Sequence, residues 1–195
     1  MNYPNGKKFI PRETKENRRL VSKDNCRNRG MALEEDINSS SNFYVNEKRA
    51  LIYKRPTPIK VVRMDKVNKA KISEAYFNEK STTDYNGVYK GRYLDFEAKE
   101  TINRTSFAFA NIRSQQVDHL EGVIENGGIA FFIIRMKAYN ETYLLDASYI
   151  ISKYRNGERK SITYDELKTN GHLINEGFAP RLDYLSVVEE VYFKN

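Results

Sequence analysis

Near the middle of the chain, polar and apolar residues alternate without interruption from Tyr93 to Lys99. Such alternation predicts a β-strand, because successive side chains of a strand point to opposite faces. The polar face would carry Tyr93, Asp95, Glu97 and Lys99, and the apolar face Leu94, Phe96 and Ala98. An ordinary half-buried strand does not need two carboxylates and a lysine in line with a further acid just upstream, Asp84. A site that holds a divalent metal ion against a phosphate does need them.

The segments after this strand predict a sheet covered by helices. Residues 113–126 have an amphipathic helical pattern, which Gly127-Gly128 ends. The wholly apolar run 129–134 is typical of a strand covered on both faces, and residues 141–145 would pair with it. Shorter helices are expected near residues 147–153, 164–169 and 182–193. Together these elements predict an α/β fold with a mixed central β-sheet flanked by helices.

The segments before the strand predict two helices. Residues 31–37 open a helix with acids in its first turn, where the helix dipole favours them. The stretch Ser39–Asn42 would interrupt this helix, and a second helix would run from about residue 43 to residue 53. Pro56 ends the pattern, because a proline disfavours helical geometry at the residue before it.

Positive charge is concentrated in two segments of a chain whose net charge is +7. Residues 1–30 hold nine Lys and Arg against three acids, and residues 47–80 hold ten against four. The first segment has no apolar periodicity and is predicted to be a flexible tail. The second contains two strand patterns, 59–64 and 72–77, which predict a hairpin or stalk with a lysine-rich tip. Two basic arms suggest a polyanionic partner, although a basic surface that serves only solubility stays an alternative.

Composition excludes several kinds of site. The single cysteine, Cys26, allows no intrachain disulfide and fits a reducing cytoplasm. With only His119 and His172 besides, a zinc cluster is not expected. No apolar run approaches the roughly 20 residues of a membrane span, and no apolar stretch of a signal peptide follows the basic start. The composition therefore predicts a cytoplasmic protein with no part in the membrane.

Asp84 and Glu97 are the first candidates for metal ligands. Mg²⁺ prefers oxygen ligands and keeps several waters, so one or two carboxylates can seat it beside a phosphate. Turn signals at Asn86-Gly87 and Lys90-Gly91 would place the two acids on neighbouring strands. Lys99 could orient an attacking water or balance the charge that develops on the phosphate. The spacing also allows a plainer interpretation, a solvated strand face with a cross-strand ion pair.

Two further acids have more than one interpretation. Asp95 could be an additional metal ligand or could support a ligand by a hydrogen bond. Glu34 lies in the first turn of the first predicted helix, where it is either a surface acid that the dipole favours or an acid near the metal.

The chain also resembles a known family. Asp84, twelve intervening residues and then Glu97-Ala98-Lys99 are similar to the D…(D/E)-x-K signature of the restriction-endonuclease-like nucleases. Closer similarity lies in Asn28–Met31, Tyr53–Pro58, Ser81–Gly87 and Gly91–Thr101. With these segments the chain resembles the RecU Holliday junction resolvases of Gram-positive bacteria, from Tyr3 to Ser186.

The resemblance implies a homodimeric endonuclease that cuts four-way junction DNA symmetrically, in recombination and repair, with Mg²⁺ or in its place Mn²⁺. The catalytic residues would be Asp84, Glu97 and Lys99, the last of which would stabilise the transition state. The metal ligands that the resemblance implies are Thr82, Asp84, Glu97 and Gln116. Without the resemblance, Thr82 has the pattern of an ordinary strand threonine and Gln116 that of an amide on a helix surface.

The same resemblance implies a division of the chain and its partners. Residues 1–29 would be the basic tail and 30–195 the nuclease domain, with the stalk inserted at about 55–80 and entering the junction centre. Contact with the RecA recombinase is also implied. The candidate phosphate contacts on the stalk are Arg63, Lys66, Lys69 and Lys71. The alternative function is that of a non-catalytic DNA-binding protein that bridges strands or modulates a recombinase.

Overall fold

The computed structural model describes residues 31–68, 70–77, 82–157 and 159–194. Apart from the first two residues of one helix, the elements below belong to one compact unit that begins at Leu33. The predicted tail 1–29, Lys69 and the end of the predicted stalk lie outside the described residues. No helix in the described ranges is both long enough and apolar enough to cross a membrane.

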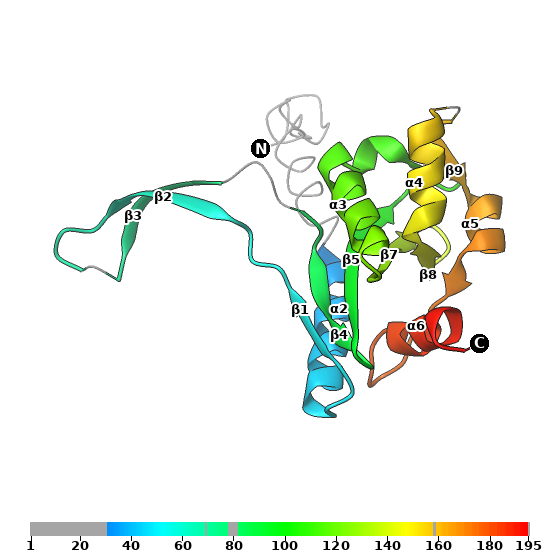
Figure 1. Ribbon diagram of the computed structural model, residues 1–195, viewed down its shortest axis with the longest axis horizontal. Coiled ribbons are helices and arrows are strands. Elements are labelled where there is room, and N and C mark those ends of the chain that lie inside the picture. The colour runs from blue at the N-terminus through cyan, green and yellow to red at the C-terminus, as the bar shows by residue number, and fades with distance from the viewer. Residues whose placement is uncertain (1–30, 69, 78–81, 158, 195) are drawn as a thin grey trace, which may run out of the picture. The chain divides into compact units, whose positions relative to one another are not determined.

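A six-stranded mixed sheet forms the centre of the fold (Figure 1). Strands β5 and β7 run parallel, and the other neighbouring pairs in the sheet are antiparallel. In spatial order the strands are β1 (Leu51–Lys54), β4 (Tyr85–Tyr89), β5 (Arg92–Thr101), β7 (Ile129–Met136), β8 (Glu141–Asp146) and β10 (His172–Leu173). The predicted α/β fold with a mixed sheet flanked by helices is therefore confirmed.

Each face of the sheet buries its own apolar cluster. Helices α2 (Met31–Asn46) and α6 (Tyr184–Tyr192) pack on one face. The opposite face is covered by α3 (Ser114–Glu125), α4 (Ala147–Asn156) and α5 (Tyr164–Asn170). Two small elements, β6 (Ser106–Ala108) and β9 (Ser161–Thr163), pair beside this second cluster, and a 3-10 turn, η1 (Phe109–Asn111), follows β6.

The alternation in β5 follows the two faces. Leu94, Phe96 and Ala98 enter the cluster under α2 and α6, as predicted. Phe96 stacks on Tyr85 of β4 and on Phe131 of β7, with ring centroids 5.0 Å and 4.6 Å apart. This stack joins three neighbouring strands on the face opposite the acids, so that the backbone carrying the acids rests on a packed support.

The first helix differs from the prediction. Helix α2 continues through Ser39–Asn42, because Ser40 and Ser41 donate to the backbone carbonyls of Asp36 and Ile37 within their own helix. Burial of its apolar face then outweighs the low helix propensity of serine. The predicted second helix is wrong in its second half, since α2 ends at Asn46 and residues 51–54 form β1.

The turn between β4 and β5 lies at Lys90-Gly91, and the predicted turn at Asn86-Gly87 is wrong. Both Lys90 and Gly91 have positive φ, 47° and 77°, as a two-residue hairpin loop requires. Gly87 is instead inside β4, where a Cβ atom would come within 2.1 Å of the Leu51 carbonyl oxygen of β1. The glycine therefore allows β1 to approach the sheet, and β1 leads directly into the site described below.

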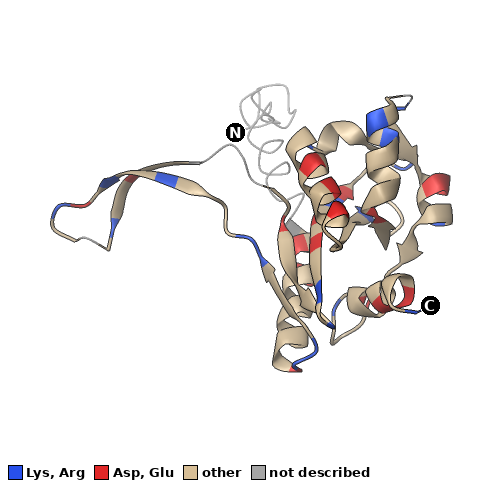
Figure 2. Ribbon diagram, viewed as in Figure 1, with Lys and Arg blue, Asp and Glu red and all other residues tan. Residues whose placement is uncertain are grey.

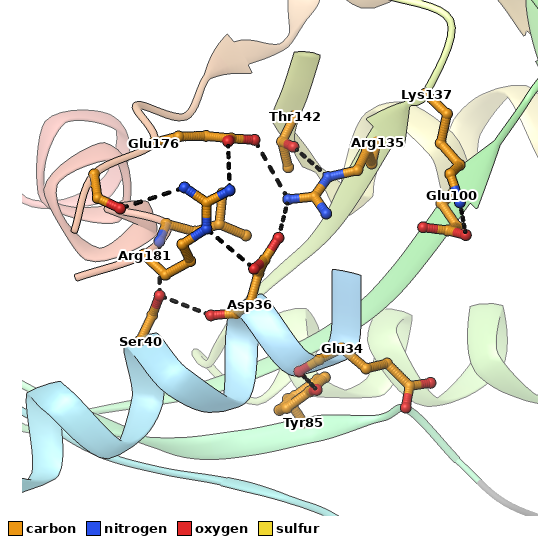
Figure 3. A network of polar contacts seen from close by, with 12 residues as sticks. Glu34, Asp36, Ser40, Tyr85, Glu100, Arg135, Lys137, Thr142, Glu176 and Arg181 are labelled. Atoms are coloured by element: carbon orange, nitrogen blue, oxygen red, sulfur yellow. Dashed lines mark hydrogen bonds and ion pairs between the residues drawn. The ribbon is translucent and has the colours of Figure 1, made fainter. Parts of the chain in front are cut away.

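A buried arginine ties α2 to the sheet (Figure 3). Arg135 of β7 donates to Asp36 of α2 at 2.7 Å and to Thr142 of β8 at 3.0 Å. Asp36 also pairs with Arg181, and Glu176 contacts both arginines. Because Arg135 is almost fully buried, each of these partners compensates part of the cost of removing its charge from water.

Candidate metal centre

Asp84 and Glu97 are neighbours across two strands. Asp84 immediately precedes β4, and the antiparallel register pairs Tyr85 with Phe96, so the next position outward places Asp84 beside Glu97. The backbone amide of Asp84 donates to Glu97 Oε2 at 3.1 Å, and the amide of Ala98 donates to Asp84 Oδ2 at 3.3 Å. Each carboxylate thus accepts a hydrogen bond from a backbone amide of the neighbouring segment, which orients it.

Glu97 is fully buried, so the interpretation of this face as solvated is wrong. Its Oε1 accepts from Lys99 Nζ and from Gln116 Nε2, both at 2.5 Å. Burial, with the charge of Asp84 added to it, raises the pKa of Glu97 to about 7. Lys99 opposes this shift but does not cancel it. Two acids and one lysine therefore leave the site short of positive charge.

Thr82 and Gln116 reach the same site from other elements. Thr82 lies just before β4 and not within it, so the plainer interpretation of Thr82 as an ordinary strand threonine is wrong. Gln116 is buried in the first turn of α3, where its side-chain oxygen accepts from the backbone amide of Arg113 at 3.0 Å. Its amide nitrogen also points to the Thr82 carbonyl, at 3.5 Å.

The chemistry of these donors fits a hard cation. Within the described ranges no group of three or more His, Cys, Asp or Glu is placed to hold a metal ion. An ion at this site must therefore combine two carboxylates with neutral oxygens or water, which is the ligation that Mg²⁺ accepts. The raised pKa of Glu97 points the same way, because a divalent cation beside the two acids would supply the missing positive charge.

Asp95 has its own set of hydrogen-bond partners. It is fully buried, and its Oδ2 accepts from Arg55 and from the Tyr93 hydroxyl, the latter at 2.8 Å. His119 Nε2 lies 2.9 Å from the same oxygen, and Thr83 donates to Oδ1. Sequence reasoning missed Arg55, Thr83 and His119 here, because only their approach in three dimensions connects them.

Glu34 is also engaged elsewhere. Its carboxylate pairs with Lys54, the last residue of β1. Its backbone carbonyl accepts from the Tyr85 hydroxyl at 3.2 Å, which fixes this turn of α2 to β4.

Three of the candidate phosphate contacts lie on or between the strands of a separate two-stranded hairpin, β2 (Ile59–Met64) with β3 (Ile72–Phe77), and Lys69 is outside the described residues. Figure 2 shows basic residues along this hairpin. Arg63, Lys66 and Lys71 are exposed, and Arg63 comes within 3.8 Å of Glu74. All six residues of β2 are exposed, so the hairpin offers both of its faces to a partner.

An α/β fold that carries Asp84 immediately before one strand and Glu97-x-Lys99 on the adjacent strand of a mixed sheet, beside a helix, belongs to the restriction-endonuclease-like class. Within this class the family is clear from the sequence comparisons. The chain belongs to the RecU family, whose model, described as Recombination protein U, matches residues 28–190.

Curated relatives extend the match over the whole chain. The Holliday junction resolvase RecU of Geobacillus thermodenitrificans is 48% identical over 198 residues, which are 99% of this chain and 98% of the relative. That of Oceanobacillus iheyensis is 45% identical over 201 residues, or 99% of this chain and all of the relative.

Proposed function

We propose that this chain is a metal-dependent endonuclease that resolves Holliday junctions in DNA recombination and repair. The observation that carries the proposal is the pairing of Asp84 with the buried Glu97, with Lys99 at 2.5 Å, in a member of the RecU family. The substrate, a four-way junction, is inferred from the names of the relatives. The acids and the lysine of the site are groups suited to metal-dependent hydrolysis of a phosphodiester.

The ligands of the ion are Thr82, Asp84, Glu97 and Gln116, and the ion is Mg²⁺ or Mn²⁺. When bound, such an ion generates a nucleophilic water and offsets negative charge on the phosphate. Lys99 holds its ammonium group next to Glu97, where it orients the water and stabilises charge that develops in the transition state. The amide of Gln116 donates to the same carboxylate oxygen, Glu97 Oε1, and helps to keep Glu97 in place.

DNA affinity comes from the two basic arms, the tail 1–29 and the hairpin within 55–80, attached to a nuclease domain of residues 30–195. Arg63, Lys66, Lys69 and Lys71 contact phosphates, which positions the protein without reading sequence. A junction with two-fold symmetry is matched by a two-fold protein, so the active form is a homodimer. The protein acts in the cytoplasm, where RecA recombinase is a further partner.

Incubation with labelled DNA tests the function directly. With Mg²⁺, we expect paired, symmetric nicks on a four-way junction and none on a linear duplex of the same sequence. With EDTA in place of Mg²⁺, cleavage should stop while a gel shift still shows junction binding. Binding without cleavage under both conditions would instead favour a non-catalytic strand-bridging protein.

The hairpin makes a separate prediction about salt. Replacing Arg63, Lys66 and Lys71 by glutamine should weaken junction binding and flatten the plot of log affinity against log salt by up to about 0.9 for each phosphate that is no longer neutralised. Glutamine at Lys160, Lys168 and Lys194 changes the net charge equally at exposed positions elsewhere and is the matched control. Equal slopes for the two triple variants would remove the hairpin from the DNA-binding surface.

A further inference from the structure

Asp95 is a buried charge that the proposed chemistry does not use. It is fully buried on the same face of β5 as Glu97, yet its carboxylate binds a different set of groups. Its partners are Arg55, Thr83, Tyr93 and His119. A buried ion pair adds little net stability over apolar side chains of similar volume, so packing alone does not account for it.

The key partner is Arg55, which stands one residue beyond β1, where the chain leaves the sheet toward the hairpin. Its backbone amide donates to the carbonyl of Asp84 at 2.8 Å. Its Nη1 donates to Thr82 Oγ1 at 2.6 Å, and its Nη2 binds Asp95. One residue at the outgoing root of the hairpin therefore holds the returning segment, Thr82 and Asp84, at two points.

Both of these points are on proposed metal ligands. A hydrogen bond from Nη1 to the Thr82 hydroxyl occupies one lone pair of that oxygen and leaves another for an ion. The guanidinium charge so close to a cation site would repel the ion if it were uncompensated. Asp95 compensates it, and Tyr93 at 2.8 Å and His119 at 3.3 Å contact the same Nη2 from the side.

We propose that Arg55 is a positioning residue that couples the root of the hairpin to the metal-binding segment 82–84, with Asp95 as its buried counter-ion. The inference rests on the proposed function, because it takes Thr82 and Asp84 as metal ligands. It assigns Arg55 no contact with substrate. Because Arg55 binds both Thr82 and Asp84, a displacement of Arg55 at the hairpin root would also shift these two proposed metal ligands.

The first test measures amide hydrogen exchange without metal or DNA. In Arg55→Ala, the amides of residue 55 and of Asp84 should exchange about tenfold faster, because the side chain that holds segment 82–84 is removed. In Arg55→Lys, one ammonium group can face Asp95 but cannot serve Thr82 as well, and we expect an intermediate increase with the fold retained. Arg155→Ala, which removes an exposed arginine that bridges to Asp118 and Glu121, is the control and should leave both amides unchanged.

The second test measures Mn²⁺ binding by calorimetry, again without DNA. Removal of a group that orients metal ligands weakens metal affinity by roughly 10–100-fold, and we expect a weakening in this range for Arg55→Ala and for Asp95→Asn. Arg55→Lys should recover part of the affinity, and Arg155→Ala should bind Mn²⁺ as the wild type does. Circular dichroism on each variant shows whether it is folded.

The outcomes separate the inference from the function. Unchanged exchange at Asp84 in folded Arg55→Ala, or wild-type Mn²⁺ affinity in both Arg55→Ala and Asp95→Asn, would overturn the positioning role. Absence of Mn²⁺ binding to the wild type would overturn the proposed metal site instead, and the exchange measurement would still decide whether Arg55 holds segment 82–84.

Discussion

Asp84→Asn is expected to lower the single-turnover rate of junction cleavage by at least about a thousandfold, since changes even to residues behind a metal ligand cost about 10–100-fold. Asparagine keeps the shape of Asp84 and an oxygen that can accept from the Ala98 amide. It removes the negative charge with which Asp84, together with Glu97, would hold the proposed divalent ion. Junction affinity in EDTA should stay within about threefold of wild type, because the phosphate contacts proposed for the basic arms would supply it.

The comparison variant is Asp165→Asn, which makes the same chemical change at an exposed position in the first turn of α5. It should cut at the wild-type rate. Cleavage by Asp84→Asn within tenfold of that rate would rule out Asp84 as a metal ligand. Failure of both binding and cleavage would indicate damage to the fold.

Lys99→Met is expected to lower the cleavage rate by about 10²–10³-fold, the usual effect of removing one group that stabilises transition-state charge. Methionine keeps most of the apolar stem but has no ammonium group to place beside Glu97 Oε1. Mn²⁺ affinity should change much less than the rate, because Asp84 and Glu97 both remain.

Single-turnover cleavage at saturating metal, with Mn²⁺ binding measured in parallel, separates these two effects. Lys137→Met is the matched variant, since Lys137 also pairs with a glutamate, Glu100, outside the site. A Lys99→Met protein that cuts as fast as Lys137→Met would exclude Lys99 from the chemistry.

The central strand was predictable because its information is local. The alternation with a period of two from Tyr93 to Lys99 is enough to assign the two faces of β5. One face enters the apolar cluster under α2 and α6, and the other carries the acids. The fully apolar run of β7 was likewise predictable, since only a strand covered on both faces tolerates it. The proximity of Asp84 and Glu97 followed from a short hairpin.

The errors arose where tertiary contacts outweigh local preference. Serines inside α2 satisfy their hydroxyls within the helix and against Tyr184, which no propensity indicates. Gly87 signals a turn in isolation, yet the close approach of β1 requires it inside a strand. Asp95 contacts Arg55 and His119, which are 40 and 24 positions away in the sequence. The alternation in β5 contains no information about these partners.

Thr82 and Gln116 illustrate an intermediate case. Only the family resemblance selected them, because a threonine before a strand and a glutamine in a first helical turn are common. In the structure the Gln116 side chain on α3 donates to Glu97 and lies 3.5 Å from the Thr82 carbonyl, and α3 packs in the second cluster.

The parallel pairing of β5 with β7 has a consequence for synthesis on the ribosome. The hairpin of β4 and β5 can form as soon as both strands have left the ribosome. Strand β7 is separated from β5 by β6, η1 and α3, and such non-local pairing forms slowly. We therefore expect Asp84 and Glu97 to come together before α3, with Gln116, packs over them. A nascent chain ending before Ile129 would carry both acids without the enclosure that buries Glu97, so we expect nuclease activity to be acquired late, after most of the chain has been made.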